Sequence, residues 1–437
     1  MSYDLVYIHP TGLDHHSWSP IIPMGVPALM QSVDCKKIGV FYDQVNEELI
    51  RSAKIVALDL HWYFHLYPVE VISAYLKRIN PSINIIAGGY TATVLAETII
   101  KNFKIDFIIK GDAEYPFVLL VNGLLGNGDI RNIPNIVAKS FSSKQDYCLT
   151  KDGFSSYVYN DLSWFPALEK IIHKAQKLKY PSWIGPWIPV SKGCKYQCSF
   201  CYGSPFLQEK INKRKIVSRP ADKVREDLLK WSRDEKIRYV HFISDFLDSE
   251  GSDYAKAVLS APYDLSVYYE FYNIPSIEEV NLFLNAFKYC HFWFTIKTDH
   301  SSGKNLNNFE AMRALFDYLK DKNCRIGLCV QPRQIFRHKD YFKMFASLAI
   351  RNKIDLLEYN WDIKVPDPMK DQESEFRNFF NLSKKSDIFP YFKKRSIEIA
   401  YGHKAFFSFL MMLGTYSVLV KCLFNFCTQS FKEATKI

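Results

Sequence analysis

The chain has 437 residues, enough for two or three domains with well-buried cores. Hydrophobic residues make up 48% of it and charged residues 23%, a balance typical of globular proteins and not of disordered or fibrous ones. The net charge of +10 favours anionic partners such as nucleotides, phospholipid headgroups or an acidic protein. No run of basic residues is interleaved with aromatic ones, so a nucleic-acid partner is not expected.

The first 140 residues alternate short apolar segments with helix-like ones such as 68–79. Apolar segments that are almost continuous in Ile and Val, with helical patterns between them, predict a doubly wound parallel sheet of Rossmann-like type. Ligands of such sheets bind at the carboxyl ends of the strands, so the loops there are candidate sites. The predicted strands are 4–10, 36–42, 53–60, 82–89 and 105–112.

Residues 141–185 are rich in Ser, Lys, Tyr and Pro and are predicted to connect two domains. A second series of strand and helix patterns fills 186–375 and opens with the strand candidate 187–193. Repeated units of this kind predict a full or partial (β/α) barrel of the TIM type, with its chemistry at the C-terminal strand ends. The further predicted strands are 238–246, 264–273, 291–299, 324–332 and 353–363.

Residues 376–437 are predicted to form a C-terminal helical region. Its segment 405–420 has no charged residue and is flanked by Lys404 and Lys421. The segment is shorter than the roughly 20 residues that span a bilayer, which leaves a buried helix or a helix lying on a membrane surface. The N-terminal sequence lacks the basic stretch and apolar core of a signal peptide, so the cytoplasm is the expected location, with membrane association through 405–420 as an alternative.

Three of the ten cysteines lie close together, with the spacing C-x3-C-x2-C over Cys194, Cys198 and Cys201. The other seven are scattered, unlike a disulfide framework. A structural zinc site needs four ligands and a thioredoxin-like site one C-x-x-C pair, so neither requires this spacing. Three thiolates on one loop can instead hold three irons of a cubane iron–sulfur cluster, which leaves the fourth iron open.

The sequence Cys194-Lys-Tyr-Gln-Cys198-Ser-Phe-Cys201 resembles the motif of the radical S-adenosylmethionine (radical SAM) enzymes, including Phe200 before the last cysteine. The resemblance implies a [4Fe–4S] cluster whose open iron binds S-adenosylmethionine (SAM). One electron then cleaves SAM to a 5′-deoxyadenosyl radical, which abstracts hydrogen from an unreactive carbon. As in that family, the motif follows the first predicted strand of the barrel.

Further SAM-binding positions follow from where the family's barrel strands end. The family's usual Gly-Gly-Glu signature is absent, and an ordinary polar group lining the barrel is the alternative at each position. The candidate SAM-binding residues are Phe200, Asp245, Glu270, Lys297, Thr298 and Gln331.

The segment 84–120 resembles the pattern Gly-Gly-x-x-Ala-Thr…Asp-x-x-x-x-Gly-(Asp/Glu)-x-Glu of the cobalamin-binding (B12-binding) domains that precede some radical SAM barrels. Cobalamin would lie at the strand ends, with its dimethylbenzimidazole tail beside Gly88 and Gly89. A fold that no longer binds cobalamin is the alternative. The candidate cobalamin-binding residues are His15, Asp59, His61, Gly88, Gly89, Tyr90, Thr91, Gly111 and Glu114.

No complete Asp-x-His-x-x-Gly motif, which supplies a histidine to cobalt in several B12 enzymes, is present. Asp59-Leu-His61 begins like it, but Phe64 replaces the glycine. His15 or His16, in an earlier loop, is the other candidate for the cobalt ligand. Hydrogen-bonding or solvent-facing histidines are the alternative.

The two resemblances cover residues 1–375 and imply a cobalamin-dependent radical SAM enzyme, with C-methyl transfer as the leading activity. In that family one SAM methylates cobalamin, and the substrate radical collects the methyl group from methylcobalamin. The alternatives are a radical SAM cyclisation, rearrangement or C–C bond formation, and a non-enzymatic zinc-binding module. Methylthiotransferases carry three more cysteines in the N-terminal domain, whereas this chain has Cys35 and Cys148 before the motif.

The implied partners are an electron donor such as flavodoxin or ferredoxin and a substrate whose identity the sequence leaves open. Aromatic residues make up 16% of the chain, which favours a roomy apolar pocket or a lipid-facing surface, with base composition as the alternative. The substrate is expected to be a small molecule, a lipid or a peptide.

Overall fold

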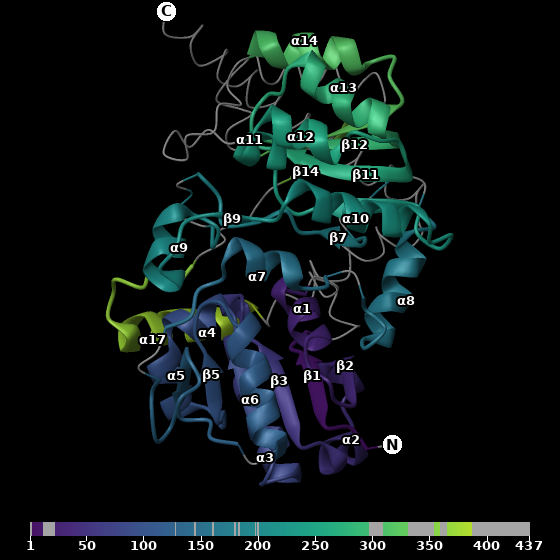
Figure 1. The fold of residues 1–437 in the computed structure, drawn as a ribbon. Coiled ribbons are helices and arrows are strands. Elements are labelled where there is room, and N and C mark those ends of the chain that lie inside the picture. Colours follow the sequence, from purple (N-terminus) through teal and green to yellow (C-terminus); the bar gives the residue numbers. More distant parts are fainter. Residues whose placement is uncertain are drawn as a thin grey trace, which may run out of the picture.

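Two parallel β-sheets, one in each half of the chain, organise the structure, which is a computed structural model (Figure 1). The structure describes residues 2–11, 22–126, 128–143, 146–159, 161–178, 181, 184–196, 198, 201–296, 309–330, 354–358 and 365–386.

The first sheet has the strand order β2-β1-β3-β4-β5-β6. Five strands are parallel, as the apolar segments of the sequence predict, and the short β6 pairs antiparallel with β5. The order places β1 between β2 and β3, so the sheet is doubly wound. The strands are β1 Leu5–His9, β2 Lys37–Phe41, β3 Ile55–Asp59, β4 Asn84–Gly88, β5 Phe107–Ile109 and β6 Ile136–Ala138.

Helices cover both faces of this sheet, and alternate residues of each strand point to opposite faces. Leu5 and Tyr7 of β1 join one buried cluster, with side chains of α1 (Gly25–Gln31), α6 (Glu114–Gly126) and α8 (Pro166–Ala175). Val6 and Ile8 join the other cluster, against α2, α3 and α5. Because both faces are buried, the strands read as continuous apolar runs. The opposite helices are α2 Glu47–Ser52, α3 Leu66–Ile79 and α5 Ala96–Asn102.

A helix from the C-terminal part of the chain completes the first half. Helix α17 (Gln372–Ser386) lies beside the helices of the first sheet (Figure 1). Its Phe376 and Phe379 are buried in that sheet's core. The Ser383 hydroxyl donates to the Phe64 carbonyl at 2.8 Å and accepts from the Tyr67 amide at 3.0 Å. The helix predicted to begin at 376 therefore starts at 372 and packs against the first domain.

The second sheet has the order β14-β13-β12-β11-β10-β7, and all its pairings are parallel. Strands β7 and β14 lie at its two edges, so in the described residues it is an open sheet, consistent with a partial barrel. β7, β10, β13 and β14 fall within predicted segments, whereas β11 and β12 begin one and four residues before theirs. The strands are β7 Trp187–Ile188, β10 Tyr239–Phe242, β11 Tyr263–Phe271, β12 Phe287–Ile296, β13 Cys324–Val330 and β14 Ile354–Glu358.

One face of the second sheet is apolar and packs against helices. Phe271 of β11 and Phe292 of β12 contact Phe283 of α13 with ring centroids 5.7 and 6.0 Å apart. The alternate residues of these strands, such as Tyr268 and Trp293, stack with each other at 5.7 Å on the opposite face. The helices of this half are α10 Ala221–Ser232, α12 Ser252–Val258, α13 Ile277–Ala286 and α14 Phe309–Leu319.

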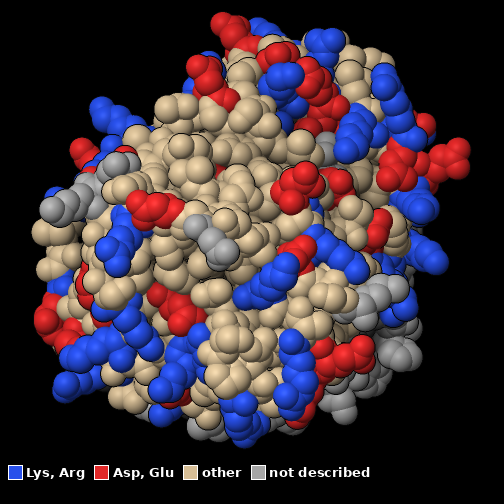
Figure 2. Space-filling view, turned by 60° about the horizontal axis from the view of Figure 1, so that its bottom comes forward, with Lys and Arg blue, Asp and Glu red and all other residues tan. Residues whose placement is uncertain are grey.

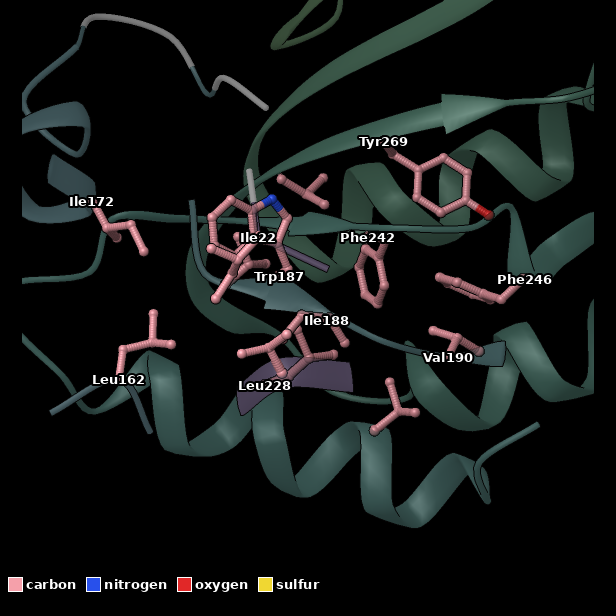
Figure 3. Close-up of a cluster of buried hydrophobic side chains, with 14 of the residues drawn as sticks. Ile22, Leu162, Ile172, Trp187, Ile188, Val190, Leu228, Phe242, Phe246 and Tyr269 are labelled. Atoms are coloured by element: carbon pink, nitrogen blue, oxygen red, sulfur yellow. The ribbon is translucent and has the colours of Figure 1, made fainter. Parts of the chain in front are cut away.

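The described part of the connection between the halves contains two helices and several buried side chains. Residues 141–185 contain α7 (Lys151–Ser156) and α8, neither of which the sequence predicts. Ile22 and Leu162 share one buried cluster with Trp187 of β7 (Figure 3). The strand that leads into the cysteine motif is therefore anchored in a core to which both halves contribute. The remaining elements are η1 Tyr42–Gln44, η2 Tyr63–His65, α4 Tyr90–Val94, β8 Ser191–Lys192, α9 Pro205–Asn212, β9 Val217–Ser218 and α11 Phe246–Glu250.

Basic and acidic side chains are interspersed on the face shown in Figure 2, around a central area of uncharged residues. Among the described residues, no helix combines the length and apolar character needed to cross a membrane. The uncharged segment 405–420 lies outside the described residues.

Candidate active site

The cysteine motif lies on a loop between β8 and α9. Gly193 enters the loop with a φ of +97°, which favours glycine, and Ile216 packs against it. Cys194 and Cys201 both approach Gly203: a Cβ placed there would lie 3.5 Å from Cys194 Cβ and 3.6 Å from Cys201 Sγ. The Cys201 amide donates to the Cys198 carbonyl at 3.1 Å. The loop therefore folds back on itself and gathers its first and last cysteines.

All three thiols are free of disulfide bonds, and only Cys198 is buried. No three His, Cys, Asp or Glu side chains in the described part of the chain are arranged to hold a single metal ion. A cubane cluster takes each thiolate on a different iron, so its ligands need not converge on one point. The donor set and the folded-back loop thus fit an iron–sulfur cluster bound by Cys194, Cys198 and Cys201.

The residues that follow the first cysteine tie the motif to the second sheet. Lys195 Nζ pairs with Asp248 Oδ1 at 3.1 Å and donates to the Asp248 carbonyl at 2.8 Å. The Asn273 amide donates to the Tyr196 hydroxyl and, at 2.7 Å, to the same Asp248 oxygen. Asp248 follows β10 and Asn273 follows β11, so the motif is held at the carboxyl edge of the second sheet.

Asp245, a predicted SAM-binding residue, is buried three residues after the end of β10 and caps α11. Its carboxylate accepts from the Tyr269 hydroxyl at 2.6 Å and from the Tyr272 and Asp248 amides at 2.7 and 3.1 Å. Burial raises the pKa of Asp245 to about 6, because these donors carry no charge. The carboxylate is thus engaged by the protein itself, and it shapes the loop that holds Asp248.

Of the other predicted SAM-binding residues, the structure describes only Glu270. Glu270 lies on β11, half-buried, in register with Trp293 of β12 and on the face opposite the helices. Because the strands are parallel, their carboxyl ends lie at the same edge as the cysteine motif. Phe200, Lys297, Thr298 and Gln331 lie outside the described residues, as do His15 and His16.

Asp59, a predicted cobalamin-binding residue, lies with three other polar side chains where β1 and β3 end. These ends flank the point at which the strand order reverses, the usual ligand position in an open α/β sheet. The Tyr7 hydroxyl donates to Asp59 Oδ1 at 2.5 Å, and His9 Nδ1 lies 2.8 Å from it. His65 Nδ1 lies 3.5 Å from Asp59 Oδ2.

Burial and the neighbouring imidazoles shift the pKa of Asp59 in opposite directions. Burial by itself would raise the pKa of Asp59, but the His9 and His65 imidazoles outweigh it and hold the pKa well below its usual range. Burial lowers the pKa of His65. Among the described residues, the buried His9 Nε2 has no hydrogen-bond partner, which leaves a polar atom that a bound group can engage.

His61 is not oriented by Asp59, as it would be in an Asp-x-His cobalt site. Its ring lies 4.9 Å from that of Tyr202, and burial lowers its pKa to about 4. The His61 carbonyl accepts from the Thr91 amide at 3.2 Å and from its hydroxyl at 2.9 Å. A Cβ on Gly89, whose φ is +110°, would lie 2.8 Å from His61 backbone atoms. The chain's own loop therefore occupies the space on the His61 side of Gly89, one of the two glycines beside which the cobalamin tail is predicted to lie.

Tyr202 brings the two predicted sites together. It follows Cys201 directly, and its ring lies 4.1 Å from that of Tyr90 and 4.9 Å from that of His61. Its neighbours Leu207 and Ile211 of α9 pack in the first sheet's core. The cysteine motif thus lies against the edge of the first sheet that carries the predicted cobalamin residues.

Gly111 and Glu114, also predicted to bind cobalamin, face the segments that flank the motif. The buried Glu114 carboxylate pairs with Lys192 of β8, and a Cβ on Gly111 would lie 2.9 Å from Asn212 Oδ1 of α9. Both residues therefore contact the second half of the chain, and neither is exposed at the carboxyl edge of the first sheet.

Several residues of the site were not predicted from the sequence. His9 could have been found, because it ends a predicted strand at the ligand edge. Asp112 lies in the same Gly-(Asp/Glu)-x-Glu motif as Gly111 and Glu114, and the others depend on contacts between residues far apart in the chain. These residues are Tyr7, His9, His65, Asp112, Lys192, Tyr202, Arg214, Asp248 and Asn273.

Solved structures of two proteins share this architecture. TsrM from Kitasatospora setae, a radical SAM methyltransferase with cobalamin and a [4Fe–4S] cluster bound, is 13% identical with a TM-score of 0.54, over 82% of this chain and 72% of that one. OxsB, a cobalamin-dependent SAM radical enzyme with aqua-cobalamin and SAM bound, is 12% identical with a TM-score of 0.54, over 88% of this chain and 56% of OxsB.

The chain has the fold of the cobalamin-dependent radical SAM enzymes. The doubly wound sheet, the second parallel sheet and the position of the cysteine motif between them agree with the resemblance seen in the sequence. No family model and no curated protein sequence matches the chain. A second TsrM structure holds tryptophan substrate and a SAM analogue.

Proposed function

We propose that this protein is a cobalamin-dependent radical SAM enzyme that transfers a methyl group to an unactivated carbon. The observation that carries the proposal is the contact of Tyr202, next to Cys201, with His61 and Tyr90 on the first sheet. It places the thiols and the predicted cobalamin residues at one shared edge, where two cofactors can act on one substrate.

When bound, a [4Fe–4S] cluster and cobalamin would supply the electron that cleaves SAM and the methyl group that is transferred. Cys194, Cys198 and Cys201 would hold the cluster. Asp248 and Asn273 keep the start of the motif in place through Lys195 and Tyr196. The network of Tyr7, His9, Asp59 and His65 would face cobalamin from the carboxyl ends of β1 and β3.

The protein's own residues also keep water away from the site. Tyr90 and the Asp59 group are buried, and the sheet face that carries Tyr268 and Trp293 is rich in aromatic rings. Exclusion of water protects a carbon radical from side reactions. We propose a small molecule, lipid or peptide as substrate and a flavodoxin- or ferredoxin-like donor, which the net charge of +10 would attract.

Anaerobic reconstitution with iron and sulfide, with and without hydroxocobalamin, tests both cofactors. We expect a brown iron–sulfur protein that retains cobalamin through gel filtration and releases 5′-deoxyadenosine from SAM under reduction. Cys201→Ala should lose the cluster and SAM cleavage, whereas Cys35→Ala, a half-buried cysteine outside the motif, should keep both.

The outcomes separate the parts of the proposal. A colourless protein that binds zinc contradicts radical chemistry altogether. A brown protein that forms 5′-deoxyadenosine but transfers no label from methyl-labelled SAM to any candidate substrate contradicts methyl transfer. In that case cyclisation, rearrangement or C–C bond formation becomes the better assignment.

A further inference from the structure

The segment Gly111-Asp112-Ala113-Glu114 connects β5 to α6 and faces the flanks of the cysteine motif. Its two carboxylates are almost completely buried, with exposed fractions of 4% for Asp112 and 1% for Glu114. Buried carboxylates need charged or hydrogen-bonding partners. The partners here come from residues on either side of the cysteine motif, about 80 to 100 positions later in the sequence.

Asp112 pairs with Arg214, which precedes β9. Arg214 donates through Nε to Asp112 Oδ2 at 2.6 Å and through Nη2 to Oδ1 at 2.8 Å, a two-pronged pairing that fixes both distance and orientation. The same guanidinium donates to the Lys192 carbonyl at 3.2 Å. Asp112 Oδ2 also accepts from the Leu149 amide at 2.9 Å. β8 and β9 pair antiparallel, and Asp112 thus joins this pair of strands to the first domain through Arg214.

Glu114 pairs with Lys192, which lies two residues before Cys194. The Lys192 ammonium also lies 4.0 Å from Asp112 Oδ1, so it is shared by the two carboxylates. Glu114 and Lys192 therefore fix the backbone that enters the motif.

The segment that leaves the motif is fixed in the same region. Tyr202 and Leu207 pack against the first sheet, and Asn212 at the end of α9 lies against Gly111. Gly111 has a φ of +68°, and a side chain there would meet Asn212. Both ends of the motif are therefore attached to one turn of the first domain.

We propose that Asp112 and Glu114 are positioning residues that hold the cysteine motif on the carboxyl edge of the first sheet, and that they do not bind cobalamin. Their role in catalysis rests on the proposed function, but their contacts with Arg214 and Lys192 do not. A buried, two-pronged pairing keeps the thiols at a fixed place relative to His61 and Tyr90. The Gly-Asp-x-Glu segment thus acts between the domains.

Amide hydrogen exchange of the protein without cofactors tests the contact directly. In Lys192→Met, the Glu114 charge stays buried without its partner, and exchange of residues 201–212 and 111–118 should rise by roughly tenfold to a hundredfold. Glu114→Gln combined with Lys192→Met should restore most of the protection, because neither charge remains. The matched control Lys223→Met removes an exposed ion pair with Glu226 and should change exchange by less than about twofold.

A second measurement links the contact to the motif. In protein with a reconstituted cluster, loss of iron to a chelator should be faster in Lys192→Met than in Lys223→Met. Unchanged exchange of 201–212 in Lys192→Met, or loss of cobalamin binding in Glu114→Gln without any change in exchange, overturns the proposal. If the unaltered protein forms no cluster, the proposed function fails, and the exchange experiment still decides the positioning role.

Discussion

Asp59 and Asp245 are two buried carboxylates in similar places, one at the end of β3 in the first sheet and one just after β10 in the second. Each accepts a short hydrogen bond from a buried tyrosine, 2.5 Å from Tyr7 and 2.6 Å from Tyr269. Their pKa values move in opposite directions: that of Asp59 falls well below its usual range, and that of Asp245 rises to about 6.

The difference comes from the remaining partners. Asp59 faces two imidazoles, whereas Asp245 faces backbone amides and the nearby Asp248 carboxylate. Burial disfavours a carboxylate in both sheets, and only a group that can carry positive charge reverses its effect. The first sheet therefore keeps a fixed negative charge at its ligand edge, and the second keeps a carboxylate that titrates near neutral pH.

The largest expected effect comes from Asp59→Asn. The substitution replaces the charged acceptor that the Tyr7 hydroxyl and the His9 ring contact by a neutral amide, so it should lower the free energy of unfolding by about 3–5 kcal/mol at neutral pH. Urea unfolding followed by circular dichroism measures the loss. Asp4→Asn is the control, since it removes the partly exposed ion pair with Lys54 but keeps an oxygen that can accept from the Lys36 amide, and it should cost less than about 1 kcal/mol. Equal losses in the two variants would mean that the Asp59 network adds nothing to stability.

Most of the fold could be predicted from the sequence, because strands buried on both faces are continuous apolar runs. β1, β3 and β4 lie within the predicted segments and are only two or three residues shorter than them. The exceptions are elements without such a pattern. β6 has three residues and pairs antiparallel with β5, and the helices between 151 and 175 lie in a stretch of mixed Ser, Lys and Tyr.

The residues of the site could be predicted where they lie close together in the sequence, as in the cysteine motif. They could not be predicted where the order of the strands brings distant residues together. His9 meets Asp59 only because β1 and β3 are neighbours in the sheet. Ser383 hydrogen-bonds to Phe64 across 319 positions, which no local pattern indicates. Glu114 was assigned to cobalamin from its motif, but its partner Lys192 becomes visible only in the folded chain.

A smaller effect is expected from the pH dependence of Asp245. Its pKa rises from 3.8 to about 6 on folding, so the folded state holds the proton more tightly. The stability that this proton contributes is present below about pH 4 and is lost as pH rises to 6, by up to about 3 kcal/mol. Asp245→Asn cannot ionise and should lack this loss.

Urea unfolding at pH 5.0 and 7.0 measures the change, taken as a difference between the two proteins. The lowered pKa values of His61 and His65 change stability in the opposite sense over an overlapping range, but they are common to both proteins and cancel. Asp59, with its lowered pKa, loses stability only below about pH 4, outside the measured window. A parallel pH dependence in the two proteins would contradict a raised pKa for Asp245.

The smallest expected effect is the difference in stability loss between Tyr7→Phe and Tyr269→Phe, and it distinguishes the two carboxylates most clearly. Tyr7→Phe removes a donor from a carboxylate that stays ionised, so it should cost about 1.5–3 kcal/mol at both pH 5 and pH 7. Tyr269→Phe should cost a similar amount at pH 7 but less at pH 5, where Asp245 is protonated and a neutral hydrogen bond is worth about 0.5–1.5 kcal/mol. The Leu247 amide, which donates to the Tyr269 hydroxyl at 3.2 Å, adds a loss that is the same at both pH values. The pH-dependent part of the stability loss in Tyr269→Phe therefore reports the protonation of Asp245 alone. A loss that does not change with pH would mean that Asp245, like Asp59, stays ionised at both pH values.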